Sequence, residues 1–570
     1  MGVQELIRAN NTASDTFLGG RFEFLQLPGG LISPCLEVPV ACGLPATVGE
    51  APISTLQSFS LGLPAFYEQG FGSAPYTFVR PFTAAYVQDA WQARPGLTLN
   101  FGLRYEVDSQ SGILNTYKKD FGPRVSFAWN PGKDQKTVIR GAYGIFYSQV
   151  YAQIPAVIKT LGDYNSSHQL ITSPVTAVST PNSTRQIANS LVSILGTPTN
   201  AALNSAAIYQ TLFAEGDIAC GTPPPGQNAC IGPQDLAQFG LNVTNSGPLP
   251  PGTVLFDAQP NYRPPQAQQA SFGIERQIGN NTSISANYIY VHTTHLPWAV
   301  DLNLLPGAPI VTGTGADGLP TNGLPFQDWG APQCAANPGL CFADPTHTIL
   351  QFNQYSSIAN AVYNGGILDI TKHFGQRITL IGNYTYSKAI DESTDFNSDY
   401  SAFDEVDLAA ERSVSDFDQR QKVVFAGVLE SPWDRSRILS GLELAPIVSY
   451  NSGHPFNLLA GSDINGDGHF TNDRPPSAAR NTGLGPNYAD LDMRLSKDFK
   501  FGNEYSLKFT AEGFNIANRT NYASVNNIVG SQFTPSFNVH GTASLSPSQP
   551  LGFTAANPKR EIQLGVRLAF

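Results

Sequence analysis

The sequence predicts an all-β fold, a transmembrane antiparallel β-barrel with about 14 strands in this chain. Segments with one apolar and one polar face recur along it, and short turns alternate with long connections. The final segment, 559–570, shows the pattern clearly, because successive side chains of a strand point to opposite faces. One such strand would also suit a soluble protein, but its repetition with one-sided long connections favours a membrane barrel. The apolar face of the final segment carries Ile562, Leu564, Val566, Leu568 and Phe570.

The composition agrees with this fold class. Charged residues make up 14% and aromatic residues 11%, with 53 glycines and 43 prolines, as suits a β-rich wall that faces lipid. The mean hydropathy of −0.15 is compatible with it, because only alternate residues of each strand are apolar. No run of about 18 apolar residues occurs, which excludes a transmembrane helix. A closed barrel is then the only remaining way to cross the membrane, because lipid offers no hydrogen-bond partner to an unpaired backbone group.

The predicted strands follow one another as hairpins. The first is expected at residues 17–26, where Phe22 and Phe24 alternate with Arg21 and Glu23. In the third, the odd-numbered residues from Leu97 are expected to face outward and the even-numbered ones inward. The thirteen strands after the first are expected at 82–92, 97–106, 122–130, 136–148, 267–277, 282–293, 361–373, 377–389, 422–430, 438–450, 488–499, 504–516 and 559–570.

The connections alternate between short turns and long loops. Outer-membrane barrels have this asymmetry, with short turns in the periplasm and long loops outside the cell. We therefore predict the cell outer membrane as the location, lipid as the partner of the apolar faces, and an unknown extracellular ligand as the partner of the loops. The net charge of −11 disfavours nucleic acid as a partner. The predicted extracellular loops are 27–81, 149–266, 294–360, 390–416, 461–487 and 517–558.

The six cysteines form three local pairs, each in a predicted extracellular loop. Pairs this close in sequence, in segments rich in proline, glycine and alanine, predict disulfides in an oxidising compartment. The predicted pairs are Cys35 with Cys42, Cys220 with Cys230, and Cys334 with Cys341.

The segment 463–473 matches the front half of a calcium loop, with oxygen ligands at positions 1, 3 and 5 and a glycine at position 6. The predicted ligands are Asp463, Asn465, Asp467, the carbonyl of His469, and Asp473 or its neighbour Asn472. Position 12 is Arg474 instead of a glutamate, which predicts weak affinity suited to extracellular calcium. The alternative is a polar loop rich in Asx turns that holds no metal. No other cofactor is expected.

Two further sets of polar residues are singled out. Acidic residues crowd 391–418 and are expected to form a solvated, anionic mouth, namely Asp391, Glu392, Asp395, Asp399, Asp404, Glu405, Asp407, Glu411, Asp416 and Asp418. Inward polar residues are expected to line the lumen, namely Arg21, Glu23, Asn100, Arg104, Glu106, Arg124, Asn287, Asn383, Asp490, Asp492, Arg494, Lys508, Glu512 and Arg567. The sequence contains no nucleophile elbow, HExxH or P-loop motif, so we do not expect an enzyme.

Several segments resemble known proteins. Residues 86–91 (YVQDAW) followed by 97–106 (LTLNFGLRYE) are similar to the barrel of TonB-dependent outer-membrane receptors. Residues 140–147 (RGAYGIFY), 384–391 (YTYSKAID) and 514–518 (FNIAN) resemble the Oar-like branch of that family. The resemblance implies a barrel of about 22 strands with a plugged lumen, insertion by the barrel assembly machinery, and ligand uptake energised through TonB.

The start of the chain bears on how much of that receptor is present. Residues 1–8 lack the basic start, apolar core and cleavage site of a signal peptide. We therefore expect the C-terminal barrel portion of a receptor, without plug or signal peptide, for a siderophore, an oligosaccharide or a peptide. The main alternative is a passive porin or surface adhesin whose long loops are functional. A soluble carbohydrate-binding protein is a third possibility, which the one-sided loops disfavour.

Overall fold

The structure is a computed structural model. It describes residues 1–13, 19–25, 43, 53–71, 75–110, 114–132, 134–161, 169–174, 205–222, 230–239, 253–311, 326–346, 349–397, 401–433, 435–436, 438–460, 463–469, 472–475, 478–501, 505–529, 543–544 and 552–570.

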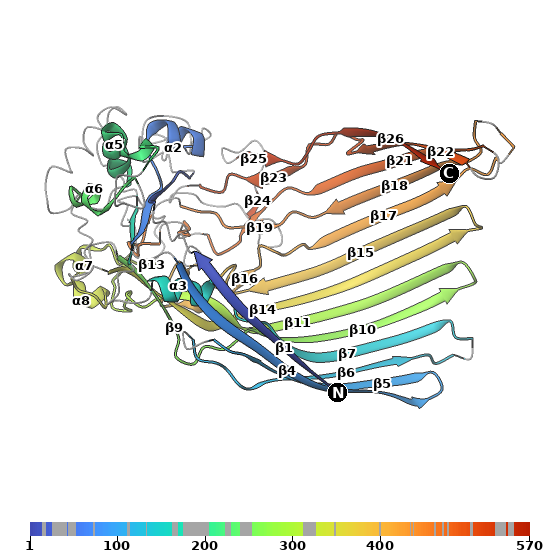
Figure 1. Cartoon of the computed structure of the whole chain (residues 1–570), viewed down its shortest axis with the longest axis horizontal. Coiled ribbons are helices and arrows are strands. Elements are labelled where there is room, and N and C mark those ends of the chain that lie inside the picture. The colour runs from blue at the N-terminus through green and yellow to red at the C-terminus, as the bar shows by residue number, and fades with distance from the viewer. Residues whose placement is uncertain are drawn as a thin grey trace.

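Fourteen strands form one continuous antiparallel row in chain order, and neighbouring strands are hydrogen-bonded along their length (Figure 1). Within the described residues, β1 pairs only with β4 and β26 only with β22, so the sheet has two edges. The row consists of β1 (Gly2–Ala13), β4 (Pro75–Arg94), β5 (Leu97–Asp108), β6 (Asp120–Trp129), β7 (Thr137–Tyr147), β10 (Gln266–Ile278), β11 (Thr282–Asp301), β14 (Ile349–Phe374), β15 (Ile378–Asp391), β17 (Gln421–Glu430), β18 (Leu442–Asn451), β21 (Tyr488–Phe501), β22 (Tyr505–Phe514) and β26 (Glu561–Ala569).

The prediction for the first strand was wrong. The row begins with β1, whose residues pair in register from Gly2 with Tyr86 to Ala13 with Pro75. The predicted segment 17–26 contributes only β2 (Arg21–Glu23), which pairs with β3 (Phe66–Phe71) outside the row. Two effects favour the earlier segment. Val3 and Ile7 lie on one face of it, with Glu5 between them. A twelve-residue partner in β4 also offers far more backbone hydrogen bonds than β3 does.

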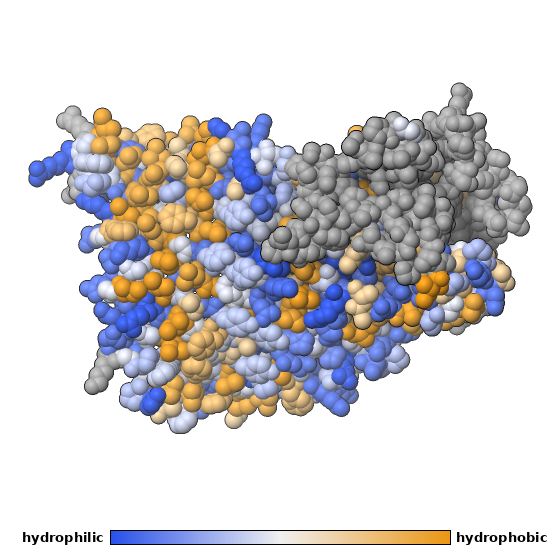
Figure 2. Space-filling model, turned by 180° about the vertical axis from the view of Figure 1, so that it is seen from behind, coloured by the Kyte–Doolittle hydropathy of each residue, from blue (hydrophilic) through white to orange (hydrophobic). Residues whose placement is uncertain are grey.

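The strand register separates an apolar outer face from a polar inner one. Phe425 stands opposite Val448 on the next strand, and Phe509 stands opposite Val566 of the terminal strand. The apolar residues of that strand, Ile562 and Leu564 among them, are 60–78% exposed. Figure 2 shows apolar side chains gathered over the strands near the turn end, with hydrophilic residues along the turns. No second layer covers this described apolar face, as a lipid-facing wall requires.

The inner face carries the polar residues that were predicted for the lumen, with two exceptions. The register places twelve of the fourteen on this face, whereas Arg21 and Glu23 lie in β2. Several charges of opposite sign are paired across strands: Arg140 Nη1 lies 3.0 Å from Glu275 Oε2, and Arg494 Nη2 lies 2.5 Å from Glu512 Oε1. The wall is therefore built to face water or a polar body.

Short turns join the strands at one end of the sheet, and long connections lie at the other (Figure 1). Several turns use a glycine in the left-handed region, such as Gly96 at φ 79°, where an added Cβ would lie 2.7 Å from the Asn130 carbonyl oxygen. A strand crosses a bilayer in about 9–11 residues. The 20 residues of β11 and 26 of β14 thus extend well beyond the membrane into the predicted loop 294–360.

The buried apolar clusters lie on the long-connection side. One joins Tyr67 to Ile208 and Leu236, and another joins Ile154 to Phe256 and Tyr355. Helices on this side are α2 (Thr55–Leu61), α3 (Gln153–Leu161), α5 (Ser205–Glu215), α6 (Pro233–Ala237), α7 (Pro332–Ala336), α8 (Pro338–Cys341), η4 (Asp217–Ala219) and η6 (Leu408–Glu411). Short strands are β8 (Gln169–Pro174), β9 (Thr253–Ala258), β12 (Ile310–Val311), β13 (Phe326–Gln327), β16 (Ser413–Val414), β19 (Pro455–Phe456), β20 (Gly483–Leu484), β23 (Tyr522–Val525), β24 (Ala543–Ser544) and β25 (Phe553–Ala556).

None of the helices in the described residues has both the length and the apolar character that a membrane crossing needs.

Candidate functional site

The candidate site lies where three long connections meet beyond the membrane end of the strands. We call it the loop junction and define it as residues 301–310, 326–346, 401–411, 463–469 and 472–475. The first two segments follow β11, the third follows β15, and the last two lie between β19 and β20. Segments far apart in sequence are joined here by buried hydrogen bonds and ion pairs.

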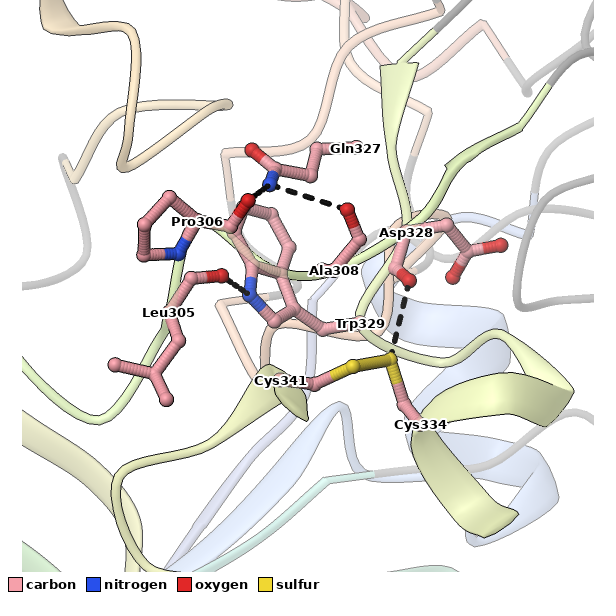
Figure 3. Close-up of a disulfide and its surroundings, with 8 residues drawn as sticks. All are labelled: Leu305, Pro306, Ala308, Gln327, Asp328, Trp329, Cys334 and Cys341. Carbon is pink, nitrogen blue, oxygen red and sulfur yellow. Dashed lines mark hydrogen bonds between the residues drawn. A yellow bond between two sulfur atoms is a disulfide. The ribbon is translucent and has the colours of Figure 1, made fainter. Parts of the chain in front are cut away.

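A disulfide stabilises one side of the loop junction (Figure 3). Cys334 and Cys341 are bonded, with their Cα atoms 5.5 Å apart, and both are buried. The indole of Trp329 lies beside them and donates a hydrogen bond to the Leu305 carbonyl at 3.1 Å. Gln327 Nε2 donates to the carbonyls of Pro306 and Ala308 at 2.9 and 3.2 Å. These bonds and the disulfide together hold residues 305–308 against residues 327–341.

The other predicted disulfides have different outcomes. Cys220 is bonded to Cys230, so that prediction is confirmed alongside the Cys334–Cys341 pair. Cys35 and Cys42 lie outside the described residues.

The predicted calcium loop is a tight, buried turn. The Asp463 carboxylate accepts hydrogen bonds from the backbone N–H groups of Gly466, Asp467 and Gly468 at 2.5, 3.2 and 3.0 Å. Asn465 Oδ1 accepts from the Asp467 N–H at 3.2 Å. Gly466 and Gly468 have φ of 70° and 85°, which other residues rarely adopt. A Cβ on Gly466 would come within 2.2 Å of the Gly330 nitrogen, so this turn and the disulfide segment require each other.

Backbone and side-chain bonds attach this turn to the other segments. The N–H of Trp329 donates to the Asn465 carbonyl at 2.6 Å, and Gln351 Nε2 donates to the Gly468 carbonyl at 2.7 Å. Asn465 Nδ2 donates to the Phe403 carbonyl at 2.8 Å. The turn is therefore the point at which the three connections are held together.

His469 does not point its ring at the predicted ligands. Its Nε2 lies 3.1 Å from Asp301 Oδ2 at the end of β11. Burial alone would lower the pKa of His469, but the hydrogen bond that its ring makes to Asp301 and the charges of Asp467 and Glu405 raise it to about 10. Burial raises the pKa of Glu405 to about 8, although the neighbouring His469 acts in the opposite direction. The imidazole of His469 thus lies among buried carboxyl groups.

The acidic segment 391–418 is only partly the solvated mouth that was predicted: Asp395 and Asp407 are exposed, four of the acids are buried, and Asp399 lies outside the described residues. Asp391, Glu405, Glu411 and Asp418 are each 3–6% exposed. Arg474 makes two bonds to the Glu411 carboxylate, of 2.6 and 2.9 Å, and Arg480 Nη1 lies 2.6 Å from Asp391 Oδ1. Burying a charge is unfavourable unless it is paired, and both arginines come from the connection between β18 and β21. The high content of acidic residues in this segment was visible in the sequence. Their arginine partners were not, because they lie 63 and 89 residues away.

The arrangement includes buried polar atoms that lack partners. Asp473 Oδ2 accepts a hydrogen bond from the Ile464 N–H at 2.7 Å. Asp473 Oδ1 is buried and has no hydrogen-bond partner within the described residues, and the same holds for Glu405 Oε1. In the described part of the chain, no three His, Cys, Asp or Glu side chains have donor atoms already gathered for a metal ion. The loop contains carboxylates that need compensation, but not a finished coordination shell.

A separate cavity of about 580 Å³ lies at the outer end of the inner face. Tyr488 and Asn451 reach it from the paired strands β21 and β18, and Tyr522 reaches it from β23. Gln419 and His454 line it as well, their Nε2 atoms 3.2 Å apart. The buried Asn451 Oδ1 lacks a hydrogen-bond partner in the described residues. Aromatic faces beside amide groups suit a polar ligand with some apolar surface.

Solved structures similar to this chain include an outer membrane transporter and a siderophore receptor. The outer membrane transporter YddB from Escherichia coli is 11% identical with a TM-score of 0.45, over 88% of this chain and 49% of that one. The siderophore receptor PirA from Acinetobacter baumannii is 10% identical with a TM-score of 0.41, over 88% of this chain and 51% of that one. The chain thus spans about half the length of these structures. A comparison with curated proteins gives no match.

The family model described as "Outer membrane beta barrel domain" matches residues 1–112, 108–479 and 476–563. This match confirms the barrel class and the outer-membrane location predicted from the alternating strands, while the Oar-like branch stays a prediction. The chain therefore belongs to the outer membrane beta barrel domain family and has its place in the bacterial outer membrane.

Proposed function

We propose that this chain forms the wall and the outer recognition surface of a TonB-dependent transporter that takes up a scarce ligand. One observation carries the proposal: the inner face of the sheet carries polar residues and oppositely charged residues that are paired across strands. An adhesin barrel needs no such interior, whereas a transporter must offer polar partners to a plug or to water. The TonB complex would act on a plug, and the barrel assembly machinery would insert the terminal strand.

The ligand is proposed to bind first in the cavity beside Tyr488 and Tyr522. An aromatic ring there supplies contact area, and the amide groups supply directional hydrogen bonds. Siderophores, oligosaccharides and peptides all combine polar groups with apolar surface, so the cavity fits the whole predicted range. We propose transport in place of catalysis as the role of this site.

Uptake measured in the producing bacterium tests this function. We expect accumulation of one probe from a panel of ⁵⁵Fe-loaded siderophores, labelled maltodextrins and labelled tripeptides, and loss of that accumulation with a proton uncoupler. Tyr522→Ala should raise the half-saturating concentration about tenfold through lost contact area. Phe213→Ala is the matched control, because Phe213 is a 63% exposed aromatic residue on α5 outside the cavity lining.

Two results would contradict the proposal. Uptake that is insensitive to the uncoupler, together with swelling of liposomes that contain the protein, would indicate a passive porin. Unchanged uptake of every probe after deletion of the gene, with loss of surface attachment, would indicate an adhesin.

A further inference from the structure

Three carboxylates of the loop junction, those of Asp463, Asp467 and Asp473, form no ion pair with a cationic side chain in the described residues. Asp467 and Asp473 are 2% and 0% exposed, and Asp463 is partly buried. The two cationic side chains that act on them are engaged elsewhere: His469 with Asp301, and Arg474 with Glu411. Burying a carboxylate is unfavourable unless it is paired, so these acids need either protons or a bound cation.

The orphan oxygen of Asp473 favours a cation. Asp473 Oδ2 accepts a hydrogen bond from the Ile464 N–H, and this bond holds the Asp473 carboxylate against the turn that begins at Asp463. Its Oδ1 is fully buried, and it has no hydrogen-bond partner in the described residues. Nearly all buried polar atoms in proteins are satisfied, so an atom of this kind indicates a missing partner. A metal ion would give that oxygen a partner and would also balance the charge of the neighbouring carboxylates.

Oxygen donors of the right kind surround this position. The Asp463 carboxylate is fixed by three backbone N–H groups, and the Asn465 and Asp467 oxygens follow at alternate positions of the same turn. The donors are carboxylate, amide and carbonyl oxygens, which are the ligands of hard cations. Calcium tolerates six to eight such oxygens in flexible geometry, whereas magnesium demands a near-ideal octahedron. An irregular loop without a finished shell therefore suits calcium better.

We propose that the side-chain oxygens of Asp463, Asn465, Asp467 and Asp473, together with the His469 carbonyl, bind a calcium ion that clamps the loop junction. Binding draws the Asp473 and Asp467 carboxylates toward Asp463, so it is coupled to closure of the loop. Because Asn465 is bonded to Trp329 and Phe403, closure tightens the contact among all three connections. The proposal requires only that the loops face the outside medium, and it does not depend on which ligand is transported.

Calorimetric titration of the full-length protein in detergent with calcium chloride tests the site directly. We expect saturable binding with a Kd of about 0.1–1 mM, the range of extracellular calcium modules, and binding of magnesium chloride about tenfold weaker. Proteinase K should cleave the loop junction more slowly in calcium than in EDTA. Absence of a binding signal up to about 10 mM calcium in the unaltered protein would overturn the proposal, whatever the variants do.

A pair of isosteric variants separates ion binding from simple packing. Asp473→Asn removes the orphan oxygen's charge and should weaken calcium binding about tenfold or more, because a coordinating carboxylate is lost. Asp407→Asn is the matched control, an exposed acid on the same side of the molecule, and it should bind calcium as the unaltered protein does. Equal calcium affinity in both variants would overturn the proposal. So would greater protease resistance of Asp473→Asn in EDTA with no effect of calcium, the result expected if these acids are protonated.

Discussion

Replacing Arg480 by methionine should destabilise the contact between the β18–β21 connection and the β15–β17 connection by about 3–5 kcal/mol. The Arg480 guanidinium bonds to Asp391 Oδ1 at 2.6 Å and to Thr394 Oγ1 at 2.8 Å, and the Arg480 and Asp391 side chains are only 4% and 7% exposed. Methionine fills much of the volume but leaves the Asp391 carboxylate buried without its cation. The free energy of opening can be measured by native-state proteolysis of outer-membrane fractions, at protease concentrations at which opening and closing are fast relative to cleavage.

Arg412→Met is the matched control for this prediction. Arg412 also pairs with an acid of the 391–418 segment, Glu392 at 3.1 Å, but its side chain is 46% exposed. Solvent screens such a pair, so its loss should cost about 0–1 kcal/mol. Equal effects of the two substitutions would show that the buried pair does not hold the connections together.

Placing an arginine at Leu368 should destabilise the folded barrel by about 2–4 kcal/mol. Leu368 is 42% exposed on the outer face of β14, between Ala286 and Tyr384 on the neighbouring strands. β14 ends at Phe374, which places Leu368 about 20 Å from the turn along the strand. At a strand tilt of about 40° this is about 15 Å along the membrane normal, near the middle of the apolar band. A guanidinium there must leave water for hydrocarbon. The folded fraction can be measured from heat-modifiable gel migration of membrane fractions.

Ile367→Arg provides the control on the opposite face of the same strand. Ile367 stands beside Asn287 and Thr385 on the inner face, where a charge remains among polar groups. We expect a folded fraction close to that of the unaltered protein. A loss at position 367 as large as that at 368 would contradict the assignment of the two faces.

The sequence was sufficient to predict thirteen of the fourteen strands of the row. Alternation of apolar and polar residues is a local signal, and contact with lipid on one face requires an apolar residue at every second position. It failed at the first strand. Val3 and Ile7 offer too short an alternation to outweigh Phe22 and Phe24, and only the long pairing with β4 decides the outcome. The apolar face of the terminal strand follows from the sequence alone, because apolar and polar residues already alternate around Val566. The same holds around Phe509 in the neighbouring strand, and the two residues stand opposite each other.

The loop junction could be predicted only in fragments. The motif from Asp463 to Asp473 and the Cys334–Cys341 pair were visible because their members are close in sequence. The residues that join them, Asp301 and Glu405, carry no local signal, and Asp301 lies 168 residues from His469. From the sequence, Arg474 could only be interpreted as a substitution for the glutamate ligand of a calcium loop. Its ion pair with Glu411 becomes visible only in the structure. Long-range burial of charge is a property of the packing.

The most direct test asks which end of the strands faces the outside. Ala410→Cys places a thiol at an exposed position of η6, and Gln376→Cys places one in the exposed turn between β14 and β15. Intact cells are treated with a maleimide-coupled polymer too large for porin channels, with the unaltered protein as the background control. Labelling of Ala410→Cys in intact cells, and of Gln376→Cys only after the envelope is opened, is the predicted result. Equal labelling of both in intact cells would contradict the membrane topology.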